Sequence, residues 1–168
     1  MVQVRQLLRR KGHAIWSVDA DEPVLEAIQM MADKHVGALP VTRGGDLVGM
    51  VSERDYARKV ILLGRSSAET PIWQIMSTPV VTATPDDGVR QCMQVMTERR
   101  IRHLPIVEGG RMVGMISIGD LVRVVIEERL NTYVEHQRLE LLKSGDLLWW
   151  SERDGWAHIY RFGADGKL

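Results

Sequence analysis

Apolar residues recur at helical spacing in two stretches of the chain. They occupy positions i, i+3, i+4 and i+7 of each stretch, namely Val24, Ala27, Ile28 and Met31 in the first and Val89, Cys92, Met93 and Met96 in the second. This spacing places the apolar side chains on one face, so each stretch is predicted to form an amphipathic helix. Acidic residues precede both stretches, as is usual at a helix start: Asp21 and Glu22, then Asp86 and Asp87.

Each predicted helix is followed by two short β-rich runs. The runs cover residues 36–41 and 47–51 after the first helix, and residues 101–107 and 112–116 after the second. A Gly-Gly pair joins the two runs in both cases, and glycine suits a tight hairpin turn that requires positive φ. A further apolar run precedes each helix, at residues 14–18 and 80–83. A second helix is expected after Ser52 and after Ser117, since serine is a good N-cap residue.

The resulting β-α-β-β-α unit occurs twice. Residues 16–56 and 81–121 are identical at 13 of 41 positions without a gap, at a constant offset of 65. Unrelated sequences would share roughly two or three identities over that length. One unit alone would leave its sheet exposed, whereas two units packed sheet to sheet bury both. We therefore predict an α+β (mixed α/β) fold of two repeats related by pseudo-two-fold symmetry.

The repeat divides the chain into four parts. We expect the first repeat and its helical head at residues 1–63, a linker at 64–76, the second repeat at 77–130, and an extension at 131–168. Trp73, Ile75 and Met76 are expected to attach the end of the linker to the core.

The extension does not follow the repeat. A helix is expected through residues 121–130, with residue 142 as its furthest extent and an end near Ser144 and Gly145. Asp154-Gly155 lies between two apolar segments and predicts a hairpin turn. Three interpretations stay open: a partner-binding or dimer-clamping element, because Trp and Tyr favour interfaces, a disordered segment, or residues foreign to the native protein.

Composition excludes several classes of protein. The 168 residues contain 22 basic and 22 acidic side chains and are 45% hydrophobic, which argues against a disordered chain and against a dedicated nucleic-acid binder. The single cysteine, Cys92, excludes an intrachain disulfide, and no two histidines have metal-ligand spacing, so we expect no metal. Without a secretory leader or an apolar run of 18 residues, a cytoplasmic protein with no membrane partner is expected. No Gly-x-Ser-x-Gly or Walker-type loop occurs, so we expect no enzymatic activity.

The second helix of each unit begins with Ser-x-x-Asp. A helix N-terminus offers unpaired N–H donors and the positive end of a dipole, which suit a phosphate. A carboxylate only accepts hydrogen bonds, so Asp55 and Asp120 could each bind both hydroxyls of a ribose. The proline of the Leu-Pro strand lacks an N–H and predicts an edge or a bend, where backbone groups stay free to bind an adenine.

These motifs together resemble the tandem cystathionine-β-synthase (CBS) domain, or Bateman module, of small stand-alone bacterial proteins. The resemblance rests on Gly37-Ala38-Leu39-Pro40-Val41 and Arg102-His103-Leu104-Pro105-Ile106, and on the closing Gly-h-h-Ser-x-x-Asp at residues 49–55 and 114–120. It implies a regulatory module without catalytic activity that binds an adenosyl ligand between the two copies. In that arrangement, the first strand of one copy faces the Ser-x-x-Asp of the other.

Two ligand sites follow from the resemblance. Site 1 would contain Lys11, Gly12, His13, Ala14, Trp16, Arg102, His103, Leu104, Pro105, Ser117, Ile118, Gly119 and Asp120. Site 2 would contain Gly37, Ala38, Leu39, Pro40, Ser52, Arg54, Asp55, Arg58, Ser77, Thr78, Val80 and Val81. Arg54 could bind a phosphate bidentately, whereas Gly119 at the equivalent position leaves room, so we expect the two pockets to differ. AMP, ATP and NAD all suit such a site, and the sequence does not choose between them.

Structural alternatives stay open beside this interpretation. Both serines could be ordinary N-caps and both aspartates first-turn acids, while the basic residues 9–11 and 54–59 could be solvated helix faces. The chain would then be a structural dimerisation module with vestigial pockets. In either case we expect a homodimer, and a sensor would also need an effector protein that this chain does not contain.

Overall fold

The computed structural model describes residues 2–12, 14–135, 139–141, 147–151 and 158–162, with side chains described as far as residue 128. The chain forms two compact units, Met1–Leu121 and Val122–Leu168. The first unit contains the helix and the hairpin of both repeats and the start of the helix that closes the second repeat.

The first repeat, called copy 1 here as the second repeat is called copy 2, follows the predicted order of elements. Its elements are β1 (Val18–Asp19), α2 (Val24–Lys34), β2 (Ala38–Arg43), β3 (Asp46–Ser52), α3 (Glu53–Tyr56) and the π-helical turn η1 (Ala57–Ile61). The sheet order is β1-β2-β3, with β1 parallel and β3 antiparallel to β2. Val24, Ala27 and Met31 of α2 are buried, which confirms the predicted apolar face of this helix.

Copy 2 repeats this plan with one strand fewer. It contains α4 (Val89–Arg99), β4 (His103–Glu108), β5 (Arg111–Ser117) and α5 (Ile118–Glu135). The register irregularity between Val41 and Thr42 of β2 recurs between Ile106 and Val107 of β4. The predicted mixed helix and strand fold of two repeats is therefore confirmed.

The first strand of copy 2 is reduced to a single parallel bridge between Ala83 and Ile106. In copy 1, the N–H of Ala20 extends the pairing by donating to the carbonyl of Thr42 at 2.8 Å. Pro85 occupies the equivalent position in copy 2 and has no N–H, so this hydrogen bond cannot form.

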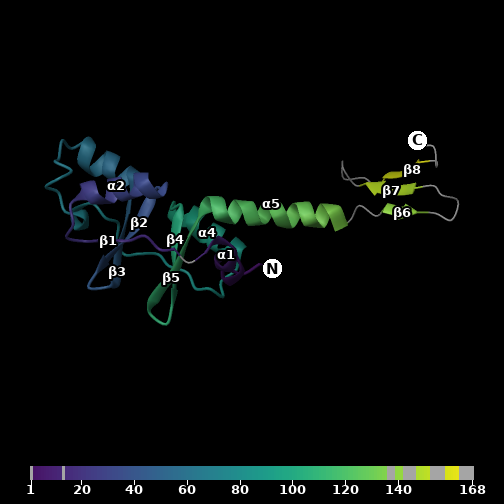
Figure 1. The fold of residues 1–168 in the computed structure, drawn as a ribbon, viewed down its shortest axis with the longest axis horizontal. Coiled ribbons are helices and arrows are strands. Elements are labelled where there is room, and N and C mark those ends of the chain that lie inside the picture. The colour runs from purple at the N-terminus through teal and green to yellow at the C-terminus, as the bar shows by residue number, and fades with distance from the viewer. Residues whose placement is uncertain (1, 13, 136–138, 142–146, 152–157, 163–168) are drawn as a thin grey trace. The chain divides into compact units, whose positions relative to one another are not determined.

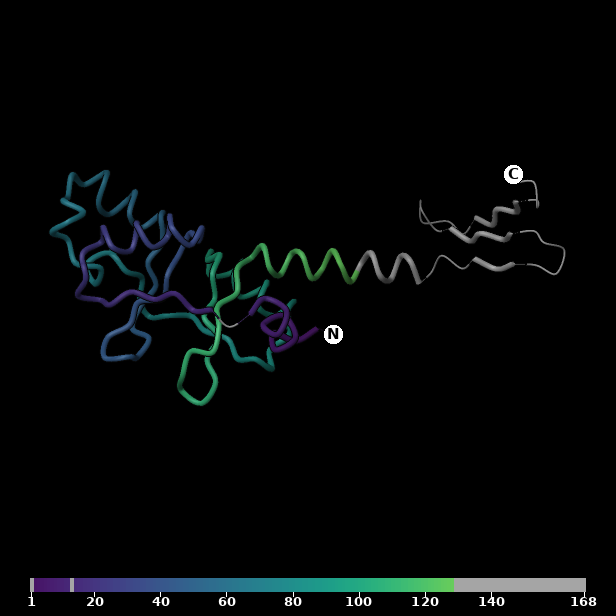
Figure 2. The backbone as a smooth tube through the Cα atoms, in the orientation of Figure 1, coloured from purple at the N-terminus to yellow at the C-terminus, as the bar shows by residue number. Residues whose placement is uncertain are grey.

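Gly-Gly turns close both hairpins, as the sequence predicted. Gly44 and Gly45 have φ of 61° and 92°, and Gly109 and Gly110 have φ of 57° and 78°. A positive φ is costly for residues with a Cβ atom, so glycine is needed at these positions. Both turns project from the same side of the first unit in Figure 2.

The N-terminal helix α1 (Val4–Lys11) docks on copy 2 rather than on copy 1. The N–H of Val4 donates to the carbonyl of Asp87 at 3.0 Å, and the N–H of Arg5 donates to the carbonyl of Pro85 at 2.8 Å. Figure 1 shows α1 beside α4 and β5. We call residues 2–11 the head.

The end of the linker docks on copy 1 by the equivalent hydrogen bonds. The N–H of Ile72 donates to the carbonyl of Glu22 and the N–H of Trp73 to that of Ala20, both at 2.9 Å. These acceptors lie 65 positions before Asp87 and Pro85. Residues 70–76 include the 3-10 turn η2 (Ile72–Gln74). This segment therefore docks on copy 1 in the same way as the head docks on copy 2.

Buried side chains hold this linker segment in place. Ile72 and Ile75 are fully buried, whereas Trp73 is 48% exposed. The expectation for Ile75 is confirmed, but the expectation that Trp73 attaches the linker to the core is wrong. Ile72 takes that role because its side chain enters the core of copy 1.

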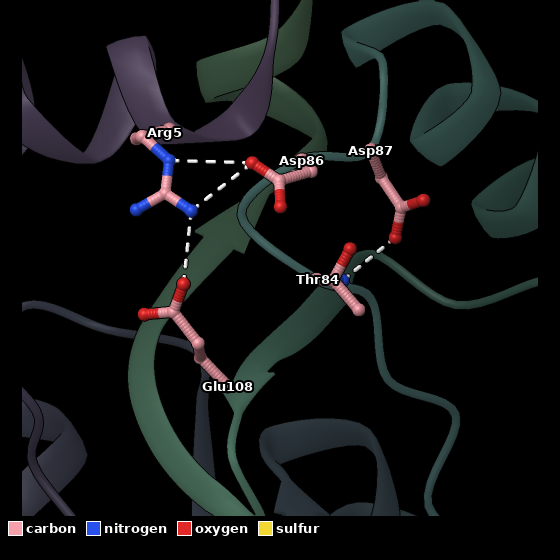
Figure 3. Close-up of polar contacts among 5 residues, drawn as sticks. All are labelled: Arg5, Thr84, Asp86, Asp87 and Glu108. Carbon is pink, nitrogen blue, oxygen red and sulfur yellow. Dashed lines mark hydrogen bonds and ion pairs between the residues drawn. The ribbon is translucent and has the colours of Figure 1, made fainter.

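Arg5 forms an electrostatic clamp between the head and copy 2 (Figure 3). Its Nη2 lies 3.0 Å from Asp86 Oδ1 and 2.9 Å from Glu108 Oε1, and hydrogen bonds to Glu108 and Asp86 raise the pKa of Arg5. In copy 1, Arg43 occupies the position equivalent to Glu108 and pairs with Asp21 at 2.7 Å. Copy 2 thus has two acids where copy 1 has an ion pair, and the head supplies the missing cation.

Two glycines allow the head and the linker to approach the hairpins closely. A Cβ atom on Gly114 would lie 2.6 Å from Leu8 Cδ2, and one on Gly49 would lie 2.9 Å from Met76 Cγ. Gly49 and Gly114 occupy equivalent positions in β3 and β5. The same close contact therefore holds both docked segments.

The second unit contains the continuation of α5 and a three-stranded sheet of β6 (Leu139–Leu141), β7 (Leu147–Ser151) and β8 (His158–Phe162). Ser151 pairs with His158 in an antiparallel ladder, as expected for the two apolar segments. The predicted turn at Asp154-Gly155 and the expected helix end near Ser144 and Gly145 lie outside the described residues. The extension of the helix to residue 142 is wrong, because residues 139–141 pair with β7 as a strand. Among the described residues, no helix is long and apolar enough to cross a membrane.

Replacing Gly114 by alanine tests the close contact with Leu8. The added methyl group would press on Leu8 and overpack the contact, so we expect Gly114→Ala to lower the free energy of unfolding by about 1–3 kcal/mol. Urea denaturation followed by circular dichroism measures the change.

Gly119→Ala is the matched control. A Cβ there meets only Ser117 Oγ, at 3.7 Å, and alanine is favoured over glycine in a helix by up to about 1 kcal/mol. Equal destabilisation by the two substitutions would contradict the role assigned to Gly114.

Candidate functional site

The Ser-x-x-Asp of copy 2 forms a reciprocal cap at the start of α5. Ser117 donates to Asp120 Oδ2 from its backbone N–H and from its hydroxyl, both at 2.8 Å, and Ser117 Oγ accepts from the N–H of Asp120 at 3.3 Å. Partial burial opposes ionisation of Asp120, but hydrogen bonds from Lys11 and Ser117 outweigh it and lower the pKa of this carboxyl. Asp120 is thus a fixed anion at a helix N-terminus.

Lys11 reaches this aspartate from the head. Its Nζ lies 2.6 Å from Asp120 Oδ2 and donates to the carbonyl of Met115 at 3.2 Å. All these contacts fall on one oxygen, and Asp120 Oδ1 accepts no hydrogen bond from the residues that the structure describes. The end of α1 and the start of α5 therefore meet, as expected for site 1, and leave one carboxylate oxygen available.

His103 stands at the same place, at the start of β4. Burial lowers the pKa of His103, and the positive charges of Lys11 and Arg102 lower it further, while Asp120 and Glu53 oppose the shift. This shift favours the neutral form of the imidazole. Charged groups from α1, α3, α5 and the approach to β4 all act on this side chain.

The two predicted sites approach one another at Gly37. A Cβ on Gly37 would lie 3.4 Å from Glu53 Oε2 and 3.9 Å from His103 Cε1. The backbone is equivalent in both copies: the N–H of Glu53 donates to the carbonyl of Gly37 at 3.2 Å, and the N–H of Ile118 donates to that of Arg102 at 2.8 Å. Gly37, assigned to site 2, therefore lies next to His103, assigned to site 1.

The Ser-x-x-Asp of copy 1 forms the same cap but uses both oxygens of its aspartate. Ser52 donates to Asp55 Oδ2 from its N–H at 3.1 Å and from its hydroxyl at 2.6 Å. Lys59 pairs with Oδ1 at 2.8 Å, and Ser77 Oγ lies 3.4 Å from the same oxygen. Ser77 is thus brought to Asp55, as expected for site 2, but the carboxylate is already occupied.

The remaining predicted residues are placed as follows. Three predicted arginines, Arg54, Arg58 and Arg102, are exposed, and so are Gly12, Ala14, Thr78 and Gly119. Three more are partly buried: Ile118, Val80 and Val81. Five are buried, and their side chains belong to the core: Ala38, Leu39, Pro40, Leu104 and Pro105. Trp16 is 41% exposed, and Lys34 Nζ lies 4.2 Å above its ring. His13 lies outside the described residues.

The two prolines have strand neighbours on one side at most. Pro40 lies in β2, the central strand of its sheet, but β1 pairs only with Val41 and Thr42, so β1 does not extend beside Pro40. The carbonyl of Pro105 accepts from the N–H of Ala83 at 3.1 Å and is not free. The N–H and C=O of a strand residue point to the same side, so the side of Pro105 that lacks an N–H faces the residues just before Ala83. These residues do not pair with β4, so the missing N–H costs no ladder hydrogen bond.

Sequence reasoning missed three groups at these sites. Lys59 lies four residues after Asp55, and this i,i+4 spacing on a helix could have revealed the pair. Glu53 and the carbonyl of Met115 carry no signal in the sequence. Within the described ranges, no cluster of three or more His, Cys, Asp or Glu side chains could hold a metal ion.

Removing the charge of Lys11 tests the electrostatics around His103. Lys11→Met removes a nearby cation, so the pKa of His103 is expected to rise towards its ordinary value, while Asp120→Asn is expected to lower it further. Titration of the imidazole resonances by NMR, assigned with His103→Gln, measures both shifts. An unchanged pKa in Lys11→Met would show that Lys11 does not act on His103.

Comparison with known proteins places both copies in one family. The family model for the CBS domain matches residues 4–61 and 72–127. A mitochondrial CBS domain-containing protein of Arabidopsis thaliana, CBSX3, is 42% identical over 135 residues, which are 74% of this chain and 65% of that protein. The chain thus spans less than two thirds of that relative.

Solved structures share the fold of this chain. A CBS-domain protein from Burkholderia ambifaria is 45% identical, with a TM-score of 0.73 over 76% of this chain and 96% of that one. The CBS domain pair of protein MJ0100, solved with 5′-methylthioadenosine and S-adenosyl-L-methionine, has a TM-score of 0.68 over 76% and 98% of the two chains. At 23% identity, this similarity indicates a shared fold and nothing more. Two family matches, the doubled caps and the shared fold together establish that this chain belongs to the CBS-domain family.

Proposed function

We propose that the chain is a non-enzymatic regulatory module that binds an adenosyl ligand of the AMP, ATP or NAD type at site 1. The proposal rests on the hydrogen bonding of Asp120. Its Oδ2 accepts from Ser117 and Lys11, whereas its Oδ1 accepts from none of the described residues. A carboxylate of this kind accepts from both hydroxyls of a ribose.

The first turn of α5 supplies the matching donor. The N–H of Ile118 is bonded to Arg102 and that of Asp120 to Ser117, whereas the N–H of Gly119 donates to none of the described residues. An unpaired N–H at a helix N-terminus suits a phosphate, and Gly119 has no side chain to block the approach. Asp120 would therefore bind the ribose, and Gly119, with Arg102 and Lys11 nearby, would bind the phosphate.

The second candidate function is a structural dimerisation module with vestigial pockets. It is favoured at site 2, because Ser52, Lys59 and Ser77 already occupy both oxygens of Asp55. Ile61, Leu62 and Leu63 form a consecutive exposed apolar run, which supports an interface in a homodimer. Such a sensor would pass its signal to an effector protein.

Calorimetric titration of the full chain with AMP, ATP, NAD and S-adenosylmethionine tests the proposal. At least one ligand is expected to bind, and Asp120→Asn is expected to weaken its binding by roughly 10–100-fold, the value of hydrogen bonds to a charged group. Asp55→Asn is the matched control at site 2 and is expected to have a smaller effect.

Thermal melting of both variants separates lost binding from lost folding. If none of the four ligands binds the native protein at millimolar concentration while light scattering shows a dimer, the dimerisation module is the better account. Turnover of a bound ligand would contradict the non-enzymatic assignment.

A further inference from the structure

Lys11 and Lys59 neutralise equivalent aspartates from different elements. Lys59 lies on the same helical segment as Asp55, at i+4, and its ammonium also donates to the carbonyl of Ile75. Lys11 lies at the last position of α1, far along the chain from Asp120, and is followed by Gly12 with φ of 89°. Lys59 is therefore committed to its own helix and the linker, whereas Lys11 is supplied to site 1 by the head.

The ammonium of Lys11 has donor capacity to spare. It donates to Asp120 Oδ2 and to Met115, and an ammonium has three N–H groups. The side chain is 41% exposed, so Nζ can turn towards a ligand without leaving the end of α1. A ligand that binds Asp120 would meet this cation directly.

The charges around site 1 set the class of ligand that is favoured. Lys11 and Arg102 contribute two cations, and Asp120 and Glu53 contribute two anions, and all four charges act on His103. A ribose bound at Oδ1 shares the carboxylate of Asp120 with Lys11, which keeps its contact with Oδ2. A phosphate on the same ligand accepts from the spare N–H of Lys11, an uncharged adenosine offers no anion there, and a sulfonium adds a further cation beside Lys11.

We infer that Lys11 is a specificity-determining residue of site 1, which selects adenosyl ligands that carry a phosphate over those that are uncharged or carry a sulfonium. The inference rests on the proposed adenosyl function and adds the residue that selects the phosphate-bearing ligands. It also assigns the head a second role, because the segment that docks on copy 2 delivers the selecting charge.

Comparing AMP with adenosine and S-adenosylmethionine on the full chain tests the inference. The native protein is expected to bind AMP roughly tenfold or more tightly than adenosine, since a charge-assisted hydrogen bond is lost with the phosphate. S-adenosylmethionine is expected to bind no better than adenosine. Equal affinities for AMP and adenosine, or tighter binding of S-adenosylmethionine, would overturn the inference without any variant.

Two substitutions of Lys11 assign the preference to this residue. Lys11→Met is expected to lower the affinity ratio of AMP to adenosine towards one, chiefly by weakening AMP, and Lys11→Arg is expected to keep the ratio. Lys59→Met is the matched control and should leave the ratio of site 1 unchanged. A native ratio that persists in Lys11→Met would overturn the inference.

The outcomes separate this inference from the proposed function. If the native chain binds neither adenosine nor AMP, both fail. If it binds them with the same affinity, or if Lys11→Met keeps the preference, the adenosyl function stands and only the role of Lys11 falls.

Discussion

The structure depends on the exchange of docking segments between the two copies. The head, which precedes copy 1, docks on copy 2, and the end of the linker, which precedes copy 2, docks on copy 1. Gly114 and Gly49 make the exchange possible, because a side chain at either position would displace Leu8 or Met76. Each copy is therefore completed by a segment that does not belong to its own repeat, and residues 1–121 form one compact unit.

The exchange is also what makes the two sites different. Both Ser-x-x-Asp caps have the same internal hydrogen bonds, so their difference comes from the lysine that each aspartate meets. Lys59 belongs to the helix that it stabilises, whereas Lys11 arrives from the head together with Arg5, which satisfies Asp86 and Glu108. The docking of the head and the proposed ligand chemistry are thus linked, since one short helix supplies both the clamp and the lysine that pairs with Asp120.

The sequence predicted what is encoded locally and repeated. The apolar spacing of α2 and α4, the Gly-Gly turns and the two-copy fold are confirmed, because each follows from propensity and periodicity over a few residues. The missing strand of copy 2 depends on the absent N–H of Pro85 opposite one carbonyl, and the burial of Ile72 depends on the path of the linker. These features depend on how two distant segments align with one another, and that alignment cannot be predicted from composition or residue spacing. The grouping of Lys11 with Asp120 came from the family resemblance, while the pairing of Lys59 with Asp55 was available from helical spacing and was missed.

The most direct test of this account is a crystal structure of the full chain with AMP. The account predicts ribose hydroxyls within hydrogen-bond distance of Asp120, roughly 2.6–3.0 Å, and the phosphate in contact with Lys11 and the N–H of Gly119. The head should remain docked on copy 2, with Leu8 over Gly114. A nucleotide bound away from the start of α5, or bound there with Lys11 still confined to Asp120 and Met115, would contradict it.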